Sequence, residues 1–103
     1  MPRLDSLVNA TTGTGLAYDS AWRGPSLVAV LTPTGVVTGG VVILEESAFA
    51  SDGNQWSQIA TFSTPAGGVT QALHVTGNFL LVRARILSPI TGGGNVTVTL
   101  GGA

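Results

Sequence analysis

The amino-acid sequence predicts an all-β fold, namely an antiparallel, jelly-roll-like β-sandwich of about seven or eight strands. Short segments rich in valine, leucine and threonine recur about every ten residues, and turns containing glycine, proline or asparagine separate them. Helical periodicity is nearly absent, because glycine or proline interrupts most windows of a dozen residues. The lack of a longer internal repeat argues against a solenoid or a propeller.

The composition indicates a single domain with very little charge. Only 9% of the 103 residues are charged and 44% are hydrophobic, whereas about 25% of an average soluble domain is charged. All four basic residues are arginine and the net charge is -1, so the basic excess of a nucleic-acid-binding protein is missing. There is no cysteine, which excludes disulfides and thiolate metal sites. We therefore expect much of the surface to lie against a protein partner.

Residues 1–14 are expected to form an extended N-terminal arm, and residues 15–103 to form the sandwich domain. The arm has one short apolar group, Leu4, Leu7 and Val8, followed by polar residues and glycines. It lacks the apolar core of a secretory signal, and no stretch of the chain approaches the roughly 18 apolar residues that span a bilayer. The sequence therefore predicts a protein that is made and folded in the cytoplasm without a membrane partner.

Three strands are expected in the first half of the sandwich. Residues 16–22 are predicted to form the first strand. Residues 26–32 are apolar on both faces and predict a central strand, which a proline turn ends at residues 32–35. Residues 36–46 are predicted to form one bent strand with a bulge at its two adjacent glycines, although a two-residue hairpin turn also fits this pattern.

The second half of the sandwich begins with a polar turn that leads into a strand. Asp52, Gly53 and Asn54 tolerate positive φ angles and can bond their own backbone, and residues 56–62 have the aromatic and β-branched content of a half-buried strand. We expect this turn to aim Trp56 into the core, because a tryptophan that leads an alternating strand is usually a packing residue.

Three further strands are expected toward the C-terminus. Residues 69–76 alternate between apolar and polar side chains, and a tight turn follows them. Residues 79–86 are the longest strand candidate, and residues 87–94 are expected to be a loop. Residues 96–100 alternate regularly between apolar residues and threonine, which predicts a strand with one buried face.

No constellation of side chains predicts enzymatic activity. His74 is the only histidine, and it has neither the ligand partners of a zinc site nor the partners of a catalytic triad. Glu45 and Glu46 are adjacent on a strand and point to opposite faces, so they cannot act as an acid-base pair on one substrate. We expect one of them to pair across strands with Arg83 or Arg85. The sequence therefore predicts a protein that is not an enzyme and has no cofactor.

Asp52 and Asn54 are the only candidates for a metal site. Their side-chain oxygens could ligate calcium, but calcium takes six to eight oxygen ligands and no other acidic cluster lies nearby in the sequence. A structural turn is the alternative interpretation of these residues, and no bound metal is expected.

Three segments of the sequence resemble known families. Residues 51–59, SDGNQWSQI, resemble the turn and strand of discoidin-like jelly-roll domains, in which a polar Asp-Gly turn leads into a strand with tryptophan and an aliphatic residue. Residues 79–86, FLLVRARI, resemble a strand that follows in such domains. Residues 91–100, TGGGNVTVTL, together with this arginine strand, also resemble small structural proteins of tailed bacteriophages. The similarity covers roughly residues 41–100.

The resemblance to phage proteins implies a virion protein, namely a capsid decoration or cement protein that binds the capsid shell and ties neighbouring capsomers together. It implies the major capsid protein or another virion protein as partner, and a homo-oligomer, with a trimer favoured over a dimer. We expect the N-terminal arm to supply the partner contacts, through Pro2, Arg3, Leu4, Leu7 and Val8.

Two alternatives remain open. A tail or head-fibre component is the nearest variant of the first hypothesis. The resemblance to discoidin-like domains implies instead a carbohydrate-binding or adhesin module, whose ligand would contact Asp52, Asn54 and Trp56. The sequence departs from the sugar-binding members of that group, because it has few aromatic side chains in exposed loops besides Trp22 and Trp56.

Overall fold

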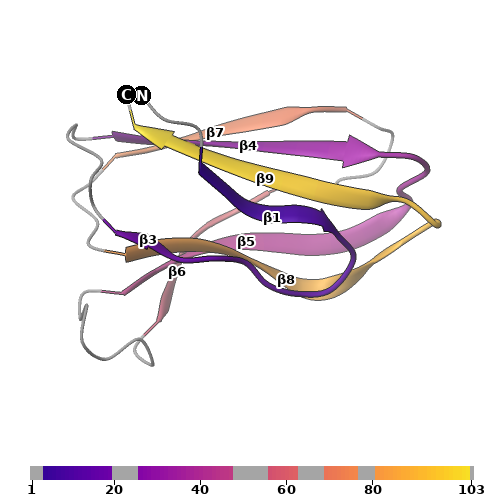
Figure 1. Ribbon diagram of the computed structural model, residues 1–103, viewed down its shortest axis with the longest axis horizontal. Coiled ribbons are helices and arrows are strands. Elements are labelled where there is room, and N and C mark those ends of the chain that lie inside the picture. The colour runs from indigo at the N-terminus through magenta and orange to yellow at the C-terminus, as the bar shows by residue number, and fades with distance from the viewer. Residues whose placement is uncertain (1–3, 20–25, 48–55, 63–68, 77–80, 103) are drawn as a thin grey trace.

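The computed structural model describes residues 4–19, 26–47, 56–62, 69–76 and 81–102. These residues contain strands and no helix, and the strands form two antiparallel sheets that face each other (Figure 1). The predicted all-β sandwich is therefore confirmed. The polar turn predicted at residues 52–54 and the tight turn predicted after residue 76 lie outside the described residues.

The first sheet, sheet A, joins strands from both ends of the chain. Its four strands are β1 (Leu4–Ala10), β4 (Ser26–Thr34), β7 (Gln71–Thr76) and β9 (Asn95–Gly102). They lie in the order β1-β9-β4-β7, and every neighbouring pair is antiparallel. The predicted central strand is confirmed, because β4 lies between β9 and β7.

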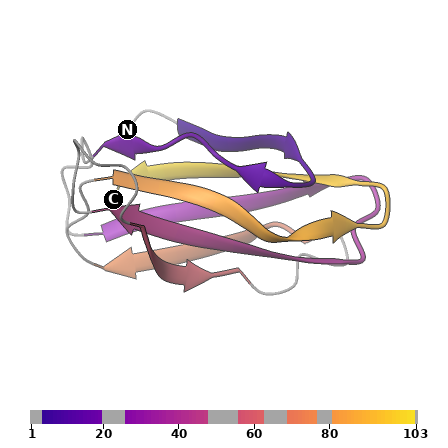
Figure 2. The same cartoon turned by 90° about the horizontal axis from the view of Figure 1, so that it is seen from below.

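The second sheet, sheet B, faces the first. Its five strands are β2 (Gly13–Thr14), β3 (Tyr18–Asp19), β5 (Gly39–Ser47), β6 (Ser57–Thr61) and β8 (Leu81–Thr91). The order is β2-β8-β5-β6, and β3 also pairs with β8. Of the strand predicted at residues 16–22, residues 16–19 are described, and only Tyr18–Asp19 form a strand, β3. Figure 2 shows the indigo N-terminal strands along one side of the sandwich and β6 and β7 along the other.

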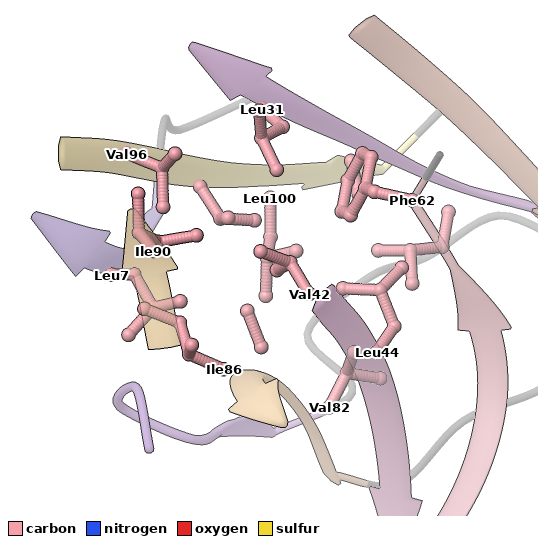
Figure 3. Packing of buried hydrophobic residues seen from close by; sticks show 14 of the residues in the cluster. Leu7, Leu31, Val42, Leu44, Phe62, Val82, Ile86, Ile90, Val96 and Leu100 are labelled. Atoms are coloured by element: carbon pink, nitrogen blue, oxygen red, sulfur yellow. The ribbon is translucent and has the colours of Figure 1, made fainter. Parts of the chain in front are cut away.

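The core lies between the two sheets and is built by alternation along each strand (Figure 3). In β9, Val96, Val98 and Leu100 are buried while the threonines between them are partly exposed, as the sequence predicts. Phe62, directly after β6, is 1% exposed and is the largest fully buried side chain among the described residues. Burial of this apolar surface is the main source of stability for the fold.

The prediction of an extended N-terminal arm is wrong for residues 4–14, because these residues belong to the sandwich. β1 pairs with β9 at the edge of sheet A, and β2 pairs with β8 at the edge of sheet B. Leu7 is 5% exposed and lies in the core. The segment has few apolar residues of its own, but the other sheet and the far end of the chain supply the surface that buries them. Residues 1–3 lie outside the described residues.

Ser6 connects the two sheets along this N-terminal side. Its Oγ donates to the carbonyl of Leu16 at 2.7 Å and accepts the N–H of Ala84 at 2.9 Å. The N–H of Gly15 donates to the carbonyl of Ala84 at 2.8 Å. A Cβ at residue 15 would collide with the backbone and the hydroxyl of Ser6, so only glycine fits there. The N-terminal segment is thus fixed to β8 of sheet B as well as to β9 of sheet A.

Strands β4 and β8 continue through prolines that the sequence placed in loops. Pro33 pairs with Val96 of β9, but it lies beyond Leu31, the last residue of β4 that pairs with β7. Pro89 lies next to the irregular part of the β5–β8 pairing. Proline is tolerated at both positions because its missing N–H removes little of the ladder. The loop predicted at residues 87–94 therefore shrinks to the turn that follows Thr91.

A bulge near the start of β5 confirms part of the prediction for residues 36–46. The pairing of β5 with β8 shifts register on both sides of Val41, and Gly40 has a φ of 131°. A Cβ on Gly40 would lie 2.6 Å from Cδ1 of Ile90, so this bend also needs a glycine. Residues 36–38 are not part of the strand, in contrast to the prediction, and carry the chain from sheet A to sheet B.

Candidate binding surfaces

The outer face of sheet A is uncharged across three neighbouring strands. β4, β7 and β9 contain no Asp, Glu, Lys or Arg. Because the inward side chains of β4 and β9 are buried and those of β7 are partly buried against the core, alternation places the intervening residues on the outer face. We call this surface the threonine-valine face. It consists of Val28, Val30, Thr32, Ala72, His74, Thr97 and Thr99.

The strand register makes the threonine-valine face continuous. Val30 lies between Thr99 of β9 and Ala72 of β7, and Thr32 lies opposite Thr97. Val28 and Val30 are only half-buried, although they sit in the middle of the sheet. The β1 margin of the face holds Asp5, whose carboxylate accepts the Thr99 hydroxyl at 2.8 Å. A continuous and uncharged surface of this kind suits contact with another protein.

The outer face of sheet B is organised around a buried carboxylate. Glu45 of β5 is 5% exposed and lies opposite Arg83 of β8. Its Oε1 accepts a hydrogen bond from Nε of Arg83 at 3.0 Å, and its Oε2 accepts one from Nη1 of Arg85 at 3.2 Å. The predicted cross-strand pairing of a glutamate with Arg83 or Arg85 is therefore confirmed, and Glu45 binds both arginines. Because the carboxylate is buried, it depends on these partners far more than an exposed one would.

Trp56 does not enter the core, so the prediction of an inward tryptophan is wrong. Its side chain is half-buried on the outer side of sheet B, where the guanidinium carbon of Arg83 lies 3.8 Å from the ring centroid. This is a cation–π contact, and it covers one face of the indole. Phe62, at the other end of β6, fills the core position instead. Asp52 and Asn54 lie outside the described residues.

The predicted contact residues of the N-terminal segment have different environments. Leu7 is buried in the core and has no surface to offer a partner. Leu4 is half-buried and packs against the core, whereas Val8 is 60% exposed. Pro2 and Arg3 lie outside the described residues. Of the described members of this set, Val8 is therefore the best placed for a contact.

The remaining titratable residues do not form a metal site in the part of the chain that the structure describes. His74 is exposed on β7, and Glu46 points away from Glu45. Among the described residues, no group of three or more His, Cys, Asp and Glu side chains could hold a metal ion. The same residues include no helix that is long and apolar enough to cross a membrane.

Large apolar side chains are also exposed at separate places on the described surface. They are half or more exposed, and they lie on β1, on β8 and in the connections between strands. They are Val8, Leu16, Val36, Val69 and Leu87. Single exposed apolar residues are normal in proteins, so none of them alone marks a site.

Comparison of the chain with protein-family models, with curated proteins and with solved structures found no significant match. The candidate surfaces therefore rest on the geometry of this chain.

The threonine-valine face was not predicted as a unit, although its parts were visible in the sequence. The alternation of threonine in residues 96–100 and of valine in residues 26–32 fixed which residues share a face. The missing information was the strand order, because β4 pairs with β9 across more than half of the chain. A local pattern does not contain such a pairing.

Proposed function

We propose that this protein is a non-enzymatic virion structural protein, a decoration or cement protein that binds a phage capsid shell through the threonine-valine face. The partner is the major capsid protein or another virion protein. The observation that carries the proposal is the continuous, uncharged outer face of sheet A. The sequence resemblance to small phage structural proteins supplies the biological setting.

Physical properties of the face support docking on a protein surface. The three strands carry no charge that would have to be desolvated on binding, and burying a charge without a partner is costly. Their side chains are mostly short or β-branched, so little side-chain entropy is lost when the face is covered. A rigid sheet that presents such a face can bind without rearrangement.

The proposed mechanism is cross-bridging of neighbouring capsomers. Each copy contributes a modest contact area, and several contacts per oligomer multiply the affinity through effective concentration. Val8, at the edge of sheet A, would add to the contact area beside the threonine-valine face. Copies that act together in this way form a homo-oligomer, as the sequence resemblance implies.

The first experiment is to purify phage particles from cells that produce this protein and to count its copies by quantitative mass spectrometry. The proposal expects many copies per particle, and cryo-electron microscopy should place them on the shell with sheet A facing the capsid. Copies confined to the tail or to head fibres would support the variant function instead. Particles without the protein would refute a virion role.

A carbohydrate-binding module is the second candidate, and the position of Trp56 favours it. The indole is half-buried on an outer face rather than in the core, and the neighbouring Arg85 side chain is 41% exposed. Aromatic rings at a surface can stack on sugars, and a free guanidinium edge can bond their hydroxyls or carboxylates. A glycan array supports this candidate only if binding is lost in Trp56→Ala. No binding to any glycan would exclude it.

A further inference from the structure

The two sheets end in edge strands that differ in how well they are protected. An unprotected edge presents unpaired backbone groups that can join another strand. Edges are usually blunted by charges, proline, irregular pairing or short length. In the described part of this sandwich, three of the edges carry such features and the β7 edge of sheet A does not.

The protected edges use different features. On the N-terminal side, β1 pairs with β9 through two register shifts, contains Asp5, and has Asn9 at a φ of 46°. At the same side of sheet B, β2 and β3 are only two residues long each. On the other side of sheet B, β6 has five residues, and its pairing shifts register between Leu44 and Glu45 of β5. Each of these edges is a poor template for a further strand.

β7 has none of these features. Its six residues, QALHVT, contain no proline, no glycine and no Asp, Glu, Lys or Arg. All six pair with β4 in one unbroken register, from Ser26 opposite Thr76 to Leu31 opposite Gln71. Sheet order leaves the far side of β7 without a strand among the described residues. The edge is therefore regular, uncharged and long enough to pair.

We propose that the β7 edge is a dimerisation site at which a second copy of this chain adds its own β7, antiparallel, across a twofold axis. In such a pair each strand meets an identical strand, so any charge on it would meet a like charge nearby. The uncharged sequence of β7 is self-compatible for this reason. The inference does not depend on binding to a capsid, and it favours a dimer over the expected trimer.

The alternation of the strand limits the possible registers. Residues directly opposite each other in an antiparallel pair have side chains on the same face of the sheet. Ala72, His74 and Thr76 face outward, whereas Leu73 and Val75 pack against the core. The twofold axis must therefore lie at a residue that is opposite its own copy, and not at the peptide bond between two residues. With the axis at Leu73 or at His74, the two β7 strands pair over most of their length. In both registers the apolar inner face continues into the second copy.

The dimer would also enlarge the threonine-valine face. Pairing through β7 joins the two four-stranded sheets into one continuous sheet, in which Ala72 and His74 of both copies lie at the centre of the outer face. The face of one copy thus continues directly into the face of the other.

The oligomeric state of the full chain is the first test. Sedimentation equilibrium over a dilution series should give a mass of twice the 10.4 kDa chain at high concentration, falling to the monomer on dilution. A monomer at every concentration would overturn the proposal. So would an assembly whose mass fits only a trimer.

A charge-swap pair then tests the location of the interface. The first variant is Ala72→Lys/His74→Lys. A lysine of one copy lies opposite a lysine of the other copy in each register in which residue 72, 73 or 74 lies on the twofold axis. This variant should therefore be monomeric. Ala72→Glu/His74→Glu should be monomeric for the same reason. An equimolar mixture should restore the dimer, because lysine then faces glutamate. Both positions are exposed, so the fold is preserved. A dimer that persists in the lysine variant would refute pairing through β7.

Thr61→Lys is the matched control. Thr61 is an exposed threonine on β6, which is the edge strand of sheet B on the same side of the sandwich as β7 (Figure 2). This variant should dimerise like the unmodified chain, and its loss of the dimer would count against β7.

The register of the two β7 strands can be measured directly by crosslinking, because the chain has no cysteine. A short thiol-specific crosslinker should join copies of either Leu73→Cys or His74→Cys far faster than copies of Thr12→Cys. Equal rates for all three would contradict the twofold pair.

Discussion

The outer faces of the two sheets differ in how they use charge. On sheet B, Glu45 is buried between Arg83 and Arg85, and Arg83 also covers Trp56. On sheet A, the strands β4, β7 and β9 carry no charged residue. The comparison indicates that sheet B uses its scarce charges for internal contacts that hold the sheet together. Sheet A keeps a neutral face, which is suited to covering by another molecule.

The largest expected effect concerns the strand that closes sheet A. Deleting residues 1–10 removes β1 together with Leu7 from the core and Ser6 from its bonds to sheet B. Losing one buried leucine costs about 2 to 5 kcal/mol, and a marginally stable domain has only about 5 to 15 kcal/mol in total. We expect the deletion to abolish the cooperative unfolding transition measured by circular dichroism.

A deletion of residues 1–3 alone is the control for this experiment and should retain the transition. If the longer deletion unfolds with the same midpoint as the full chain, residues 4–10 are an arm after all, and the pairing of β1 with β9 is not essential.

The next largest effect tests the internal use of charge on sheet B. Glu45→Ala leaves two arginines without their shared carboxylate. Breaking a fully buried pair costs about 3 to 5 kcal/mol, and the arginine side chains here are 22% and 41% exposed, so we expect about 2 to 3 kcal/mol. Urea unfolding measures this loss. Glu46→Ala is the control and should cost less, and equal losses would mean that the ion pairs add nothing specific.

A smaller effect separates the two arginines. Arg83 binds Glu45 and covers Trp56, whereas Arg85 binds Glu45 and is more exposed. Arg83→Ala should therefore lower the unfolding free energy by about 1 to 2 kcal/mol, and Arg85→Ala by about 0.5 to 1 kcal/mol. Measured side by side in the same denaturant series, the reverse order would contradict the assignment of Arg83 as the central partner.

The smallest expected effect on stability is on the neutral face of sheet A. Thr32→Lys places a charge on an exposed position whose neighbour across the strands is Thr97. Surface substitutions usually change stability by less than about 0.5 kcal/mol, and we expect the same in thermal unfolding. A clear destabilisation would mean that the face is already covered within the folded chain, so that no partner could dock there.

The sequence was sufficient to predict the sandwich, most strands and a cross-strand ion pair between one of the two adjacent glutamates and Arg83 or Arg85. The alternation of residues 96–100 identifies the buried face of β9, and the alternation of Arg83 and Arg85 places both on one face of β8. Adjacent glutamates must point to opposite faces, which leaves one of them for the arginines. These are local rules, and they hold because each strand is half-buried.

The errors came from contacts between distant segments. β1 was missed because its partner, β9, lies at the opposite end of the chain and supplies the surface that buries Leu7. The prolines of β4 and β8 were assigned to loops because the sequence does not show which side of each strand lacks a neighbour. Trp56 was placed in the core because a tryptophan that leads an alternating strand is usually a packing residue. Its observed partner, Arg83, lies on a strand that comes later in the chain, and the local pattern does not show that contact.

The most direct test of the central claim is to measure how Thr32→Lys and Thr61→Lys bind to phage particles from which the protein has been stripped. Both substitutions put the same charge in place of an exposed threonine, one on the threonine-valine face and one on β6 of sheet B. The account predicts that Thr32→Lys loses most of its occupancy while Thr61→Lys binds like the unmodified protein. Equal occupancy of the two variants would contradict docking through sheet A.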